Sequence, residues 1–312
     1  MSAPLFTVLL PVHRPPALLP FAVRSVLAQS CAALELFIIC DGAPAETVAA
    51  AEAFAAADPR VRVFAHPKGE RNGEAYRHLA LEQASGRYVC QIGDDDLWFA
   101  DHLAEAAQLL AEADFGALLG LQLHPNGAPF LHLIDLEHPT VRESMLRNRF
   151  NFFGPTCAAY RLEAYRALPV GWSPAPKDIW SDLWMWRKFL AQPGLRFATR
   201  PVATSLGLPA SLRADLTLEQ RQAEAAGYAE QLARPGFREA LWRAALLEHA
   251  GQALQWRLDG LSGQRRAAAA EARLAELTAA LAAVAAAAGD SAAQTRIARA
   301  ALAGESAPTD AV

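Results

Sequence analysis

Short apolar runs alternate with helical segments through the first hundred residues. In chain order, the strand-like and helical stretches lie at residues 5–12, 18–27, 34–40, 45–57, 61–64, 76–84 and 88–92. The first run has no polar alternation, which is typical of a parallel strand covered on both faces. Strand, helix and strand in that order predict right-handed crossovers. The pattern therefore predicts an α/β fold with a Rossmann-like, mainly parallel sheet sandwiched by helices.

Polar residues follow three of these strand-like runs at their carboxyl ends. Residues 11–14 end the first run, Asp41 ends the second, and Asp94–Asp96 follow the fourth. In open α/β sheets, ligands bind beyond the carboxyl ends of the strands, near the point where the strand order reverses. We therefore predict that these segments meet at one ligand site.

Three consecutive carboxylates mark the end of the fourth run. Residues 88–92 lead into a predicted turn that carries Asp94, Asp95 and Asp96, and buried carboxylates need a partner. Mg²⁺ and Mn²⁺ prefer oxygen ligands and are often held by one or two carboxylates, with water and substrate phosphates completing the shell. The triplet therefore suggests a metal-diphosphate site. The alternative is a solvated turn that caps a helix beginning near Phe99.

Composition narrows the class of protein. The 312 residues are 53% hydrophobic, which is enough for one large core and a smaller second unit. A formal net charge of -4 provides no bulk attraction to nucleic acid. The four cysteines form no CxxC pair, and neither a signal-peptide pattern nor an apolar run of about 18 residues is present. We therefore expect a cytoplasmic protein that binds no nucleic acid and spans no membrane.

Four ordered motifs and the aspartate triplet together resemble a known family. The motifs are Thr7–Arg14, Ser25–Ser30, Glu35–Gly42 and Gly86–Tyr88, followed by Asp94–Asp96. In this order and spacing they resemble the nucleotide-binding half of glycosyltransferase family 2, which has the GT-A fold. The resemblance is strong over the first third of the chain and continues more faintly to about residue 205.

The resemblance implies a nucleotide site built from three segments. Pro11, Val12 and His13 correspond to the family segment that lines the base and ribose. Asp41 takes the position that bonds the uracil edge in UDP-sugar enzymes, although Cys40 replaces the preceding acidic residue. Arg77 corresponds to a family arginine whose charge would offset the diphosphate, with His78 replacing the usual asparagine after it. The alternative for Arg77 is a solvated position on a helix surface.

The aspartate triplet matches the family's DxD motif. The resemblance implies that Asp94 and Asp95 contact the donor and that Asp95 and Asp96 hold Mn²⁺ or Mg²⁺. A metal ion would stabilise the negative charge on the departing nucleoside diphosphate.

A second acidic site lies near residue 182. The family commonly carries Glu-Asp at the start of a helix, followed by a tryptophan and a basic residue; here Ser181 replaces the glutamate, while Asp182, Trp186 and Lys188 fit. Inversion at a sugar carbon requires a carboxylate that removes the acceptor proton, and we predict Asp182 for this role. Asp178 is the alternative base, and an ordinary helix start is the alternative reading of residues 181 and 182.

Aromatic residues are dense around this second site. Four of the seven tryptophans lie there, at Trp172, Trp180, Trp184 and Trp186. Sugar rings stack on aromatic planes through their CH faces. Trp172 lies in a predicted loop and is the first candidate for acceptor contact, and Trp186 is the second.

The composition shifts after about residue 208. We expect a GT-A domain over 1–208, divided into a nucleotide-binding half at 1–100 and an acceptor half at 101–208. Separate alanine-rich helices at 219–232, 237–261 and 265–288 would form a helical extension over 209–288, followed by a partly disordered tail at 289–312. Leu274, Leu277, Leu281 and Val284 have the spacing of a helix-packing seam that spans under two heptads, which favours packing onto neighbouring helices. An oligomer or a bound partner is the alternative.

The family resemblance, with the aspartate triplet and Asp182, implies an inverting, metal-dependent hexosyltransferase of polysaccharide biosynthesis. It would move a sugar, most simply from a UDP-sugar, to a glycan or another hydroxyl acceptor, in solution or peripherally at a membrane. One alternative is a non-catalytic nucleotide-sugar-binding or scaffold protein that works through its helical extension. A nucleotidyltransferase would need a glycine-rich phosphate loop after the first strand, and residues 11–16 contain no glycine.

Overall fold

The computed structural model describes residues 3–286 of the chain. The chain divides into two compact units, and the boundary between them in the sequence lies between His249 and Ala250. The first unit contains every described strand, and the second contains the continuation of the last helix.

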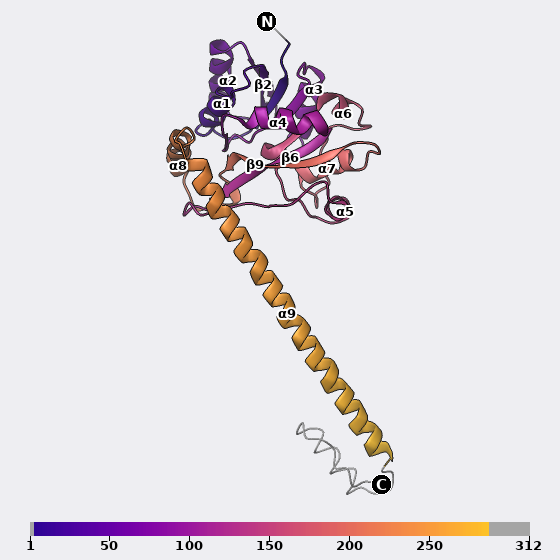
Figure 1. Cartoon of the computed structure of the whole chain (residues 1–312). Helices are drawn as coiled ribbons and strands as arrows, with labels where there is room; N and C mark the ends of the chain where they lie inside the picture. Colours follow the sequence, from indigo (N-terminus) through magenta and orange to yellow (C-terminus); the bar gives the residue numbers. More distant parts are fainter. Residues whose placement is uncertain (1–2, 287–312) are drawn as a thin grey trace. The chain divides into compact units, whose positions relative to one another are not determined.

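The amino-terminal half is a parallel α/β unit (Figure 1). The strands β1 (Phe6–Val12), β2 (Leu34–Asp41), β3 (Val61–His66) and β4 (Tyr88–Gln91) lie in the order β3-β2-β1-β4 and are parallel. The helices α1 (Leu19–Leu27), α2 (Ala45–Ala57) and α3 (Glu74–Glu82) connect them. The predicted alternation is confirmed; α3 begins two residues earlier than expected and β3 continues to His66.

The second half makes the sheet mixed. Its strands are β5 (Asp96–Trp98), β6 (Phe115–Leu123), β7 (Pro129–Phe130), β8 (Ala158–Arg161) and β9 (Phe197–Gly207). β8 lies antiparallel between β4 and β6, β9 is parallel to β6, and β5 and β7 are antiparallel additions to β9 and β6. The helices are α4 (His102–Glu112), α5 (Pro139–Arg147), α6 (Leu162–Arg166) and α7 (Ser181–Leu190). The parallel arrangement of the first four strands therefore ends at β4, and the strand order reverses between β1 and β4.

The sheet is buried on both faces, as the continuous apolar runs predict. Along β1, Val8 and Leu10 enter one core cluster with α1 and α4, while Leu9 enters the opposite cluster. The opposite cluster is rich in aromatic side chains, and fully buried Phe115 stacks on Phe189 with ring centroids 4.7 Å apart. These two clusters hold the strand ends in fixed relative positions.

A third cluster joins part of the predicted helical extension to the sheet. Ala225 of α8 (Leu218–Gln231) and Ala245 of α9 (Phe237–Ala286) pack with Leu97, Leu121 and Leu206. A capping box between Thr217 and Gln220 defines the start of α8. The first compact unit consequently continues to His249, beyond residue 208 where the sequence suggested the end of the domain.

The last helix differs from the sequence expectation. Instead of two helices at 237–261 and 265–288, one helix runs from Phe237 to Ala286, and its glycines do not interrupt it. Leu254, Leu258 and Leu274 are exposed in the second unit. The side chains of Leu277, Leu281 and Val284 and the predicted tail at 289–312 lie outside the described parts, so the packing seam stays a prediction.

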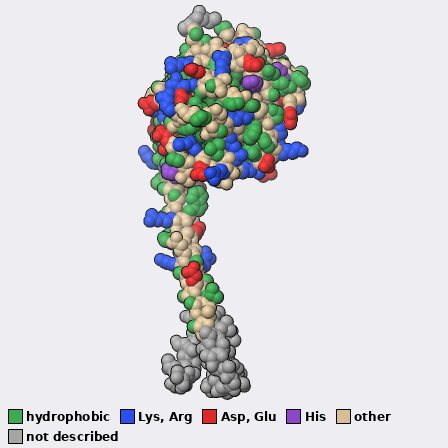
Figure 2. Space-filling view, turned by 90° about the vertical axis from the view of Figure 1, so that its right-hand side faces the viewer, with side chains coloured by type: hydrophobic (Ala, Val, Ile, Leu, Met, Phe, Trp, Pro, Cys, Tyr) green, Lys and Arg blue, Asp and Glu red, His purple; other side chains and the backbone are tan. Residues whose placement is uncertain are grey.

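The surface and the helix lengths agree with the composition. On the face shown in Figure 2, acidic and basic side chains are interspersed over the first unit, without a large area of one sign. Across residues 3–286, every helix is too short or too polar to cross a bilayer.

We expect Phe115→Ala to lower the free energy of unfolding by about 3–5 kcal/mol, because it removes a buried ring from the centre of the aromatic cluster. Urea unfolding followed by tryptophan fluorescence measures the change. The matched control is Leu247→Ala, whose side chain is 70% exposed and should change stability by less than about 0.5 kcal/mol. Equal midpoints for the two variants would contradict this account of the core.

Candidate functional site

A cavity of about 590 Å³ opens beyond the carboxyl ends of β1, β2 and β4. We call it the strand-end cavity. Its lining includes all residues predicted to bind the donor nucleotide, together with the predicted base: Pro11, Val12, His13, Asp41, Arg77, Asp94, Asp95 and Asp182. The polar ends of three strands therefore meet at one place, as the strand-end argument predicts. Asp182, which is 171 residues after Pro11 and was not part of that argument, lines the same cavity.

A second cavity of about 410 Å³ lies over β6, and we call it the β6 cavity. Its lining includes Asp96, Asn151 and several aromatic residues. Asp95, Pro155, Trp180 and Asp182 line both cavities. Two adjoining cavities that share carboxylates are suited to holding two substrates side by side.

The aspartate triplet is a cluster of one buried and two half-buried residues rather than a solvated cap. Asp94 is 4% exposed, and Asp96 begins β5, which pairs with β9. Asp96 accepts hydrogen bonds from the Thr156 hydroxyl and from the Leu208 amide, the latter at 3.3 Å. α4 begins only at His102, so the proposed capping role near Phe99 is wrong. The triplet is held by tertiary contacts that its own sequence does not reveal.

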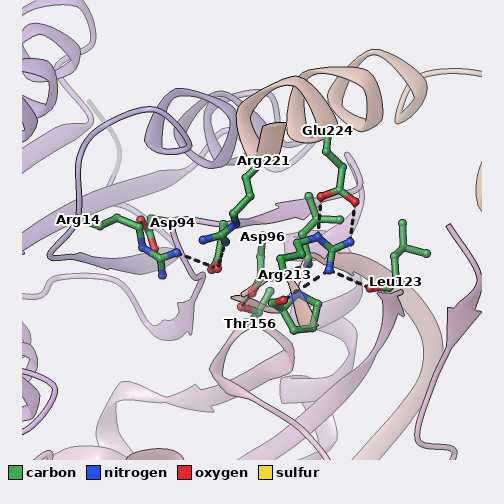
Figure 3. A network of polar contacts seen from close by, with 11 residues as sticks. Arg14, Asp94, Asp96, Leu123, Thr156, Arg213, Arg221 and Glu224 are labelled. Atoms are coloured by element: carbon green, nitrogen blue, oxygen red, sulfur yellow. Dashed lines mark hydrogen bonds and ion pairs between the residues drawn. The ribbon is translucent and has the colours of Figure 1, made fainter. Parts of the chain in front are cut away.

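Arginines from both ends of the first unit neutralise this cluster. Arg14 Nε lies 3.0 Å from Asp94 Oδ2, and Arg14 Nη1 lies 3.1 Å from Asp95 Oδ2. Arg221 Nη2 of α8 lies 2.9 Å from the same Asp95 oxygen (Figure 3). Burial raises the pKa of Asp94 and of Asp96 to about 7, and in both cases the charge of Asp95 adds to the rise. The site therefore concentrates negative charge that cations stabilise.

The geometry around Gly93 fits a divalent cation. A Cβ atom at Gly93 would lie 3.2 Å from Asp95 Oδ1 and 3.0 Å from Asp96 Oδ2, so the two carboxylates converge there. Within the described residues, no group of three or more His, Cys, Asp or Glu side chains is arranged to hold a metal. Two carboxylates with water and diphosphate oxygens are a usual Mg²⁺ or Mn²⁺ environment, and this donor set suits such an ion.

Arg77 is buried, so the solvated alternative is wrong. Its side chain lies over the Trp172 ring, with the guanidinium carbon 4.9 Å from the ring centroid, and the residue is 7% exposed. Burial lowers its pKa. Within residues 3–286, its Nε and Nη1 atoms have no hydrogen-bond partner. A buried guanidinium with free donors beside a cavity is well placed to bind a phosphate.

Asp41 and His13 complete the nucleotide side. Asp41 accepts a hydrogen bond from the Gly69 amide at 2.6 Å and pairs with Lys68. Gly73 passes so close to Asp41 that a Cβ atom there would lie 2.6 Å from the carboxylate, and its φ of 66° also favours glycine. Burial and the neighbouring Arg14 lower the pKa of His13, which favours the neutral ring. Asp41 is therefore oriented by its loop before any ligand binds.

Asp182 lies in the first turn of α7, as its sequence position suggests. Its Oδ1 accepts a hydrogen bond from the Leu183 amide at 2.7 Å, and its Oδ2 accepts one from Asn151 Nδ2 at 2.9 Å. Burial raises its pKa, which makes the carboxylate a better proton acceptor. Asp178 is exposed and lines neither cavity, so the structure favours Asp182 over this alternative.

Both predicted acceptor tryptophans belong to the core, and this prediction is corrected. Trp172 is 3% exposed and Trp186 is 0% exposed, and their rings pack edge to face at 5.7 Å. Their large apolar surfaces pack inside the aromatic cluster. The position of Trp172 in a predicted loop does not show whether its ring is buried or exposed. Trp180 is instead 45% exposed and lines both cavities.

Departures from the family pattern have internal partners. Cys40 is buried in β2, and His78 Nδ1 lies 2.8 Å from the Tyr165 hydroxyl. Ser181 donates a hydrogen bond to Glu74, a fully buried residue of α3. A carboxylate thus lies beside Ser181 even though the family's glutamate is absent from that position.

Sequence reasoning missed several residues that shape the site. Arg14 falls within the polar strand end at residues 11–14, and this position was the sequence signal that could have identified it as a site residue. Thr156, Trp180 and Arg221 come from other elements, and Arg221 is separated from Asp95 by 126 positions. No local pattern connects residues at that separation.

Comparisons with known proteins agree with this geometry. Residues 7–168, more than half of the chain, match the sequence model of Glycosyl transferase family 2. A PGL/p-HBAD biosynthesis glycosyltransferase of Mycobacterium bovis (strain BCG / Pasteur 1173P2) is 30% identical over 115 residues, covering 36% of this chain and 44% of that protein. An uncharacterized glycosyltransferase of Haemophilus influenzae is 28% identical over 112 residues, with the same two coverages. The chain therefore matches less than half of the length of these relatives.

Solved structures show the same fold. S. aureus TarS superimposes with a TM-score of 0.53 at 16% identity, covering 73% of this chain and 68% of that one. TarS in complex with UDP-GlcNAc gives a TM-score of 0.53 at 17% identity, over 65% of this chain and 58% of that one. The family match and the shared architecture agree, and the chain belongs to glycosyltransferase family 2, with a GT-A fold.

Proposed function

We propose that this chain transfers a sugar from a nucleoside-diphosphate sugar to an acceptor hydroxyl, with inversion at the sugar carbon. The observation that carries the proposal is that Asp95 and Asp182 both line the strand-end cavity and the β6 cavity. A donor in the first cavity and an acceptor in the second would meet between the two carboxylates.

Two residues of the strand-end cavity support its assignment to the donor. Asp41 can accept a hydrogen bond from the nucleotide base, and Arg77 has hydrogen-bond donors that lack partners among the described residues and can bind a diphosphate. UDP is the first nucleotide to test, because TarS, which shares the fold, is solved with UDP-GlcNAc. Asp95 and Asp96 would hold Mn²⁺ or Mg²⁺, which as a Lewis acid stabilises charge on a leaving diphosphate.

Asp182 supplies the base in this proposal. Its carboxylate accepts the proton of the acceptor hydroxyl while the hydroxyl oxygen forms a bond to the anomeric carbon, and the bond from that carbon to the phosphate oxygen breaks on the opposite side. Asn151 holds the carboxylate in place through its 2.9 Å hydrogen bond. Attack opposite the leaving group produces inversion.

The β6 cavity is the proposed acceptor side. Phe130, Phe152 and the exposed ring of Trp180 contribute aromatic surface to it. Such surfaces stack on the CH faces of sugar rings. Trp180 therefore replaces Trp172 and Trp186 as the residue proposed to contact an acceptor glycan.

We expect nucleoside-diphosphate binding to require a divalent cation. Calorimetry should show UDP binding with Mn²⁺ and at least about tenfold weaker binding with EDTA, because the aspartates otherwise repel the diphosphate. Asp96→Asn should weaken Mn²⁺-dependent binding similarly while keeping hydrogen-bond capacity toward Thr156 and Leu208. Equal UDP affinity with Mn²⁺ and with EDTA would exclude a metal-dependent donor site.

We expect Asp182→Asn to reduce turnover by about a hundredfold or more while leaving UDP affinity nearly unchanged, because a base acts only in the chemical step. Hydrolysis across a panel of nucleotide sugars with Mn²⁺ measures turnover without a known acceptor. Asp178→Asn is the matched control and should behave as the wild type. Wild-type turnover in Asp182→Asn would assign the base elsewhere, and donor binding without turnover of any nucleotide sugar would favour a non-catalytic binding protein.

A further inference from the structure

Helix α8 reaches the aspartate cluster through a single arginine. Arg221 Nη2 lies 2.9 Å from Asp95 Oδ2, and Arg14 Nη1 lies 3.1 Å from the same oxygen. Figure 3 shows Arg221 extending from its helix toward Arg14 and the aspartates. Two guanidinium groups therefore share one carboxylate oxygen, while Asp95 Oδ1 faces Gly93 and Asp96.

Arg221 also has an unused donor. In the described part of the chain its Nε is buried without a hydrogen-bond partner, whereas Arg14 Nε lies 3.0 Å from Asp94 Oδ2. The side chain of Arg221 is 13% exposed. Buried guanidinium nitrogens without partners are uncommon, and an incoming anion is one way to satisfy them.

The position of α8 is held firmly before any ligand binds. Arg213 has a fully buried side chain, bonds both oxygens of Glu224 at 2.6 and 2.7 Å, and donates to the Leu123 carbonyl at 3.0 Å (Figure 3). Glu224 lies on α8, so these bonds anchor the helix to β6. Ala225 adds apolar contacts in the third core cluster. Arg221 is thus presented to Asp95 by a rigid element.

We infer that Arg221 is a positioning residue of the donor site and that α8 completes this site. The inference rests on the proposed function. Arg221 orients Asp95 by pairing with the Oδ2 atom of Asp95, and it adds a positive charge beside the proposed binding position of the donor diphosphate. α8 lies outside residues 7–168, which match the family, and inside the helical extension that the sequence predicted over 209–288.

The inference predicts two effects of opposite sign for Arg221→Gln. Removing one of two cations from Asp95 should strengthen binding of Mn²⁺ alone by roughly twofold to fivefold, because like charges compete for the carboxylate. The same change should weaken UDP binding at saturating Mn²⁺ by about tenfold or more, because a charge favourable to the diphosphate is lost. A purely structural role would move both affinities in the same direction.

The experiment measures free Mn²⁺ by electron paramagnetic resonance and UDP binding by calorimetry, with GDP in parallel. Arg221→Lys keeps the charge and should retain wild-type Mn²⁺ affinity. Arg234→Gln removes an exposed arginine just after α8 and should leave both affinities unchanged. Parallel losses of both affinities, or values for Arg221→Gln within the error of the wild type, would overturn the inference.

Hydrogen exchange on the wild-type protein tests the inference even if Arg221→Gln does not fold. Adding Mn²⁺ and UDP should slow exchange of the α8 amides by about threefold or more if the helix is part of the site, and unchanged exchange with bound UDP would overturn the inference. Failure of the wild type to bind either nucleoside diphosphate would remove the proposed function together with the inference. Normal wild-type binding with an unaltered Arg221→Gln variant would remove the inference alone.

Discussion

Mutual repulsion among Asp94, Asp95 and Asp96 is the constraint on which the site depends. Three carboxylates at one buried strand end would be unstable without cations, and burial raises the pKa of Asp94 and Asp96 to about 7. Arg14 and Arg221 supply positive charge to the cluster, although they lie near the two sequence ends of the first unit. The strand-end cavity, the junction of β4 and β5 and the docking of α8 are therefore electrostatically linked.

The reversal of the sheet explains why two cavities adjoin. β4 is the last strand of the amino-terminal parallel set, and antiparallel β8 separates it from β6. The strand-end cavity forms over the parallel side, and the β6 cavity forms over the mixed side. Asp182, on the first turn of α7, lies at their boundary. A transfer reaction needs this arrangement, because its two substrates must meet while each is bound by its own surface.

Local sequence correctly placed the aspartates at a cavity, whereas it misplaced two of the tryptophans. Asp94–Asp96 were recognisable because a strand end in an α/β sheet is a ligand position wherever the rest of the chain packs. Trp172 and Trp186 were misassigned because sequence does not distinguish an aromatic residue that faces a cavity from one that packs in the aromatic cluster. The two predicted carboxyl-terminal helices proved to be one, since Gly263 between them did not end the helix.

The sequence by itself determined the alternation of strands and helices, the polar strand ends and the family of this protein, because these depend on local periodicity and ordered motifs. Only the tertiary structure decided that Trp180 rather than Trp172 faces the cavities, that Asp182 rather than Asp178 lies between them, and that Arg221 reaches Asp95. Burial and long-range ion pairs depend on how distant elements pack. No short stretch of sequence contains that information.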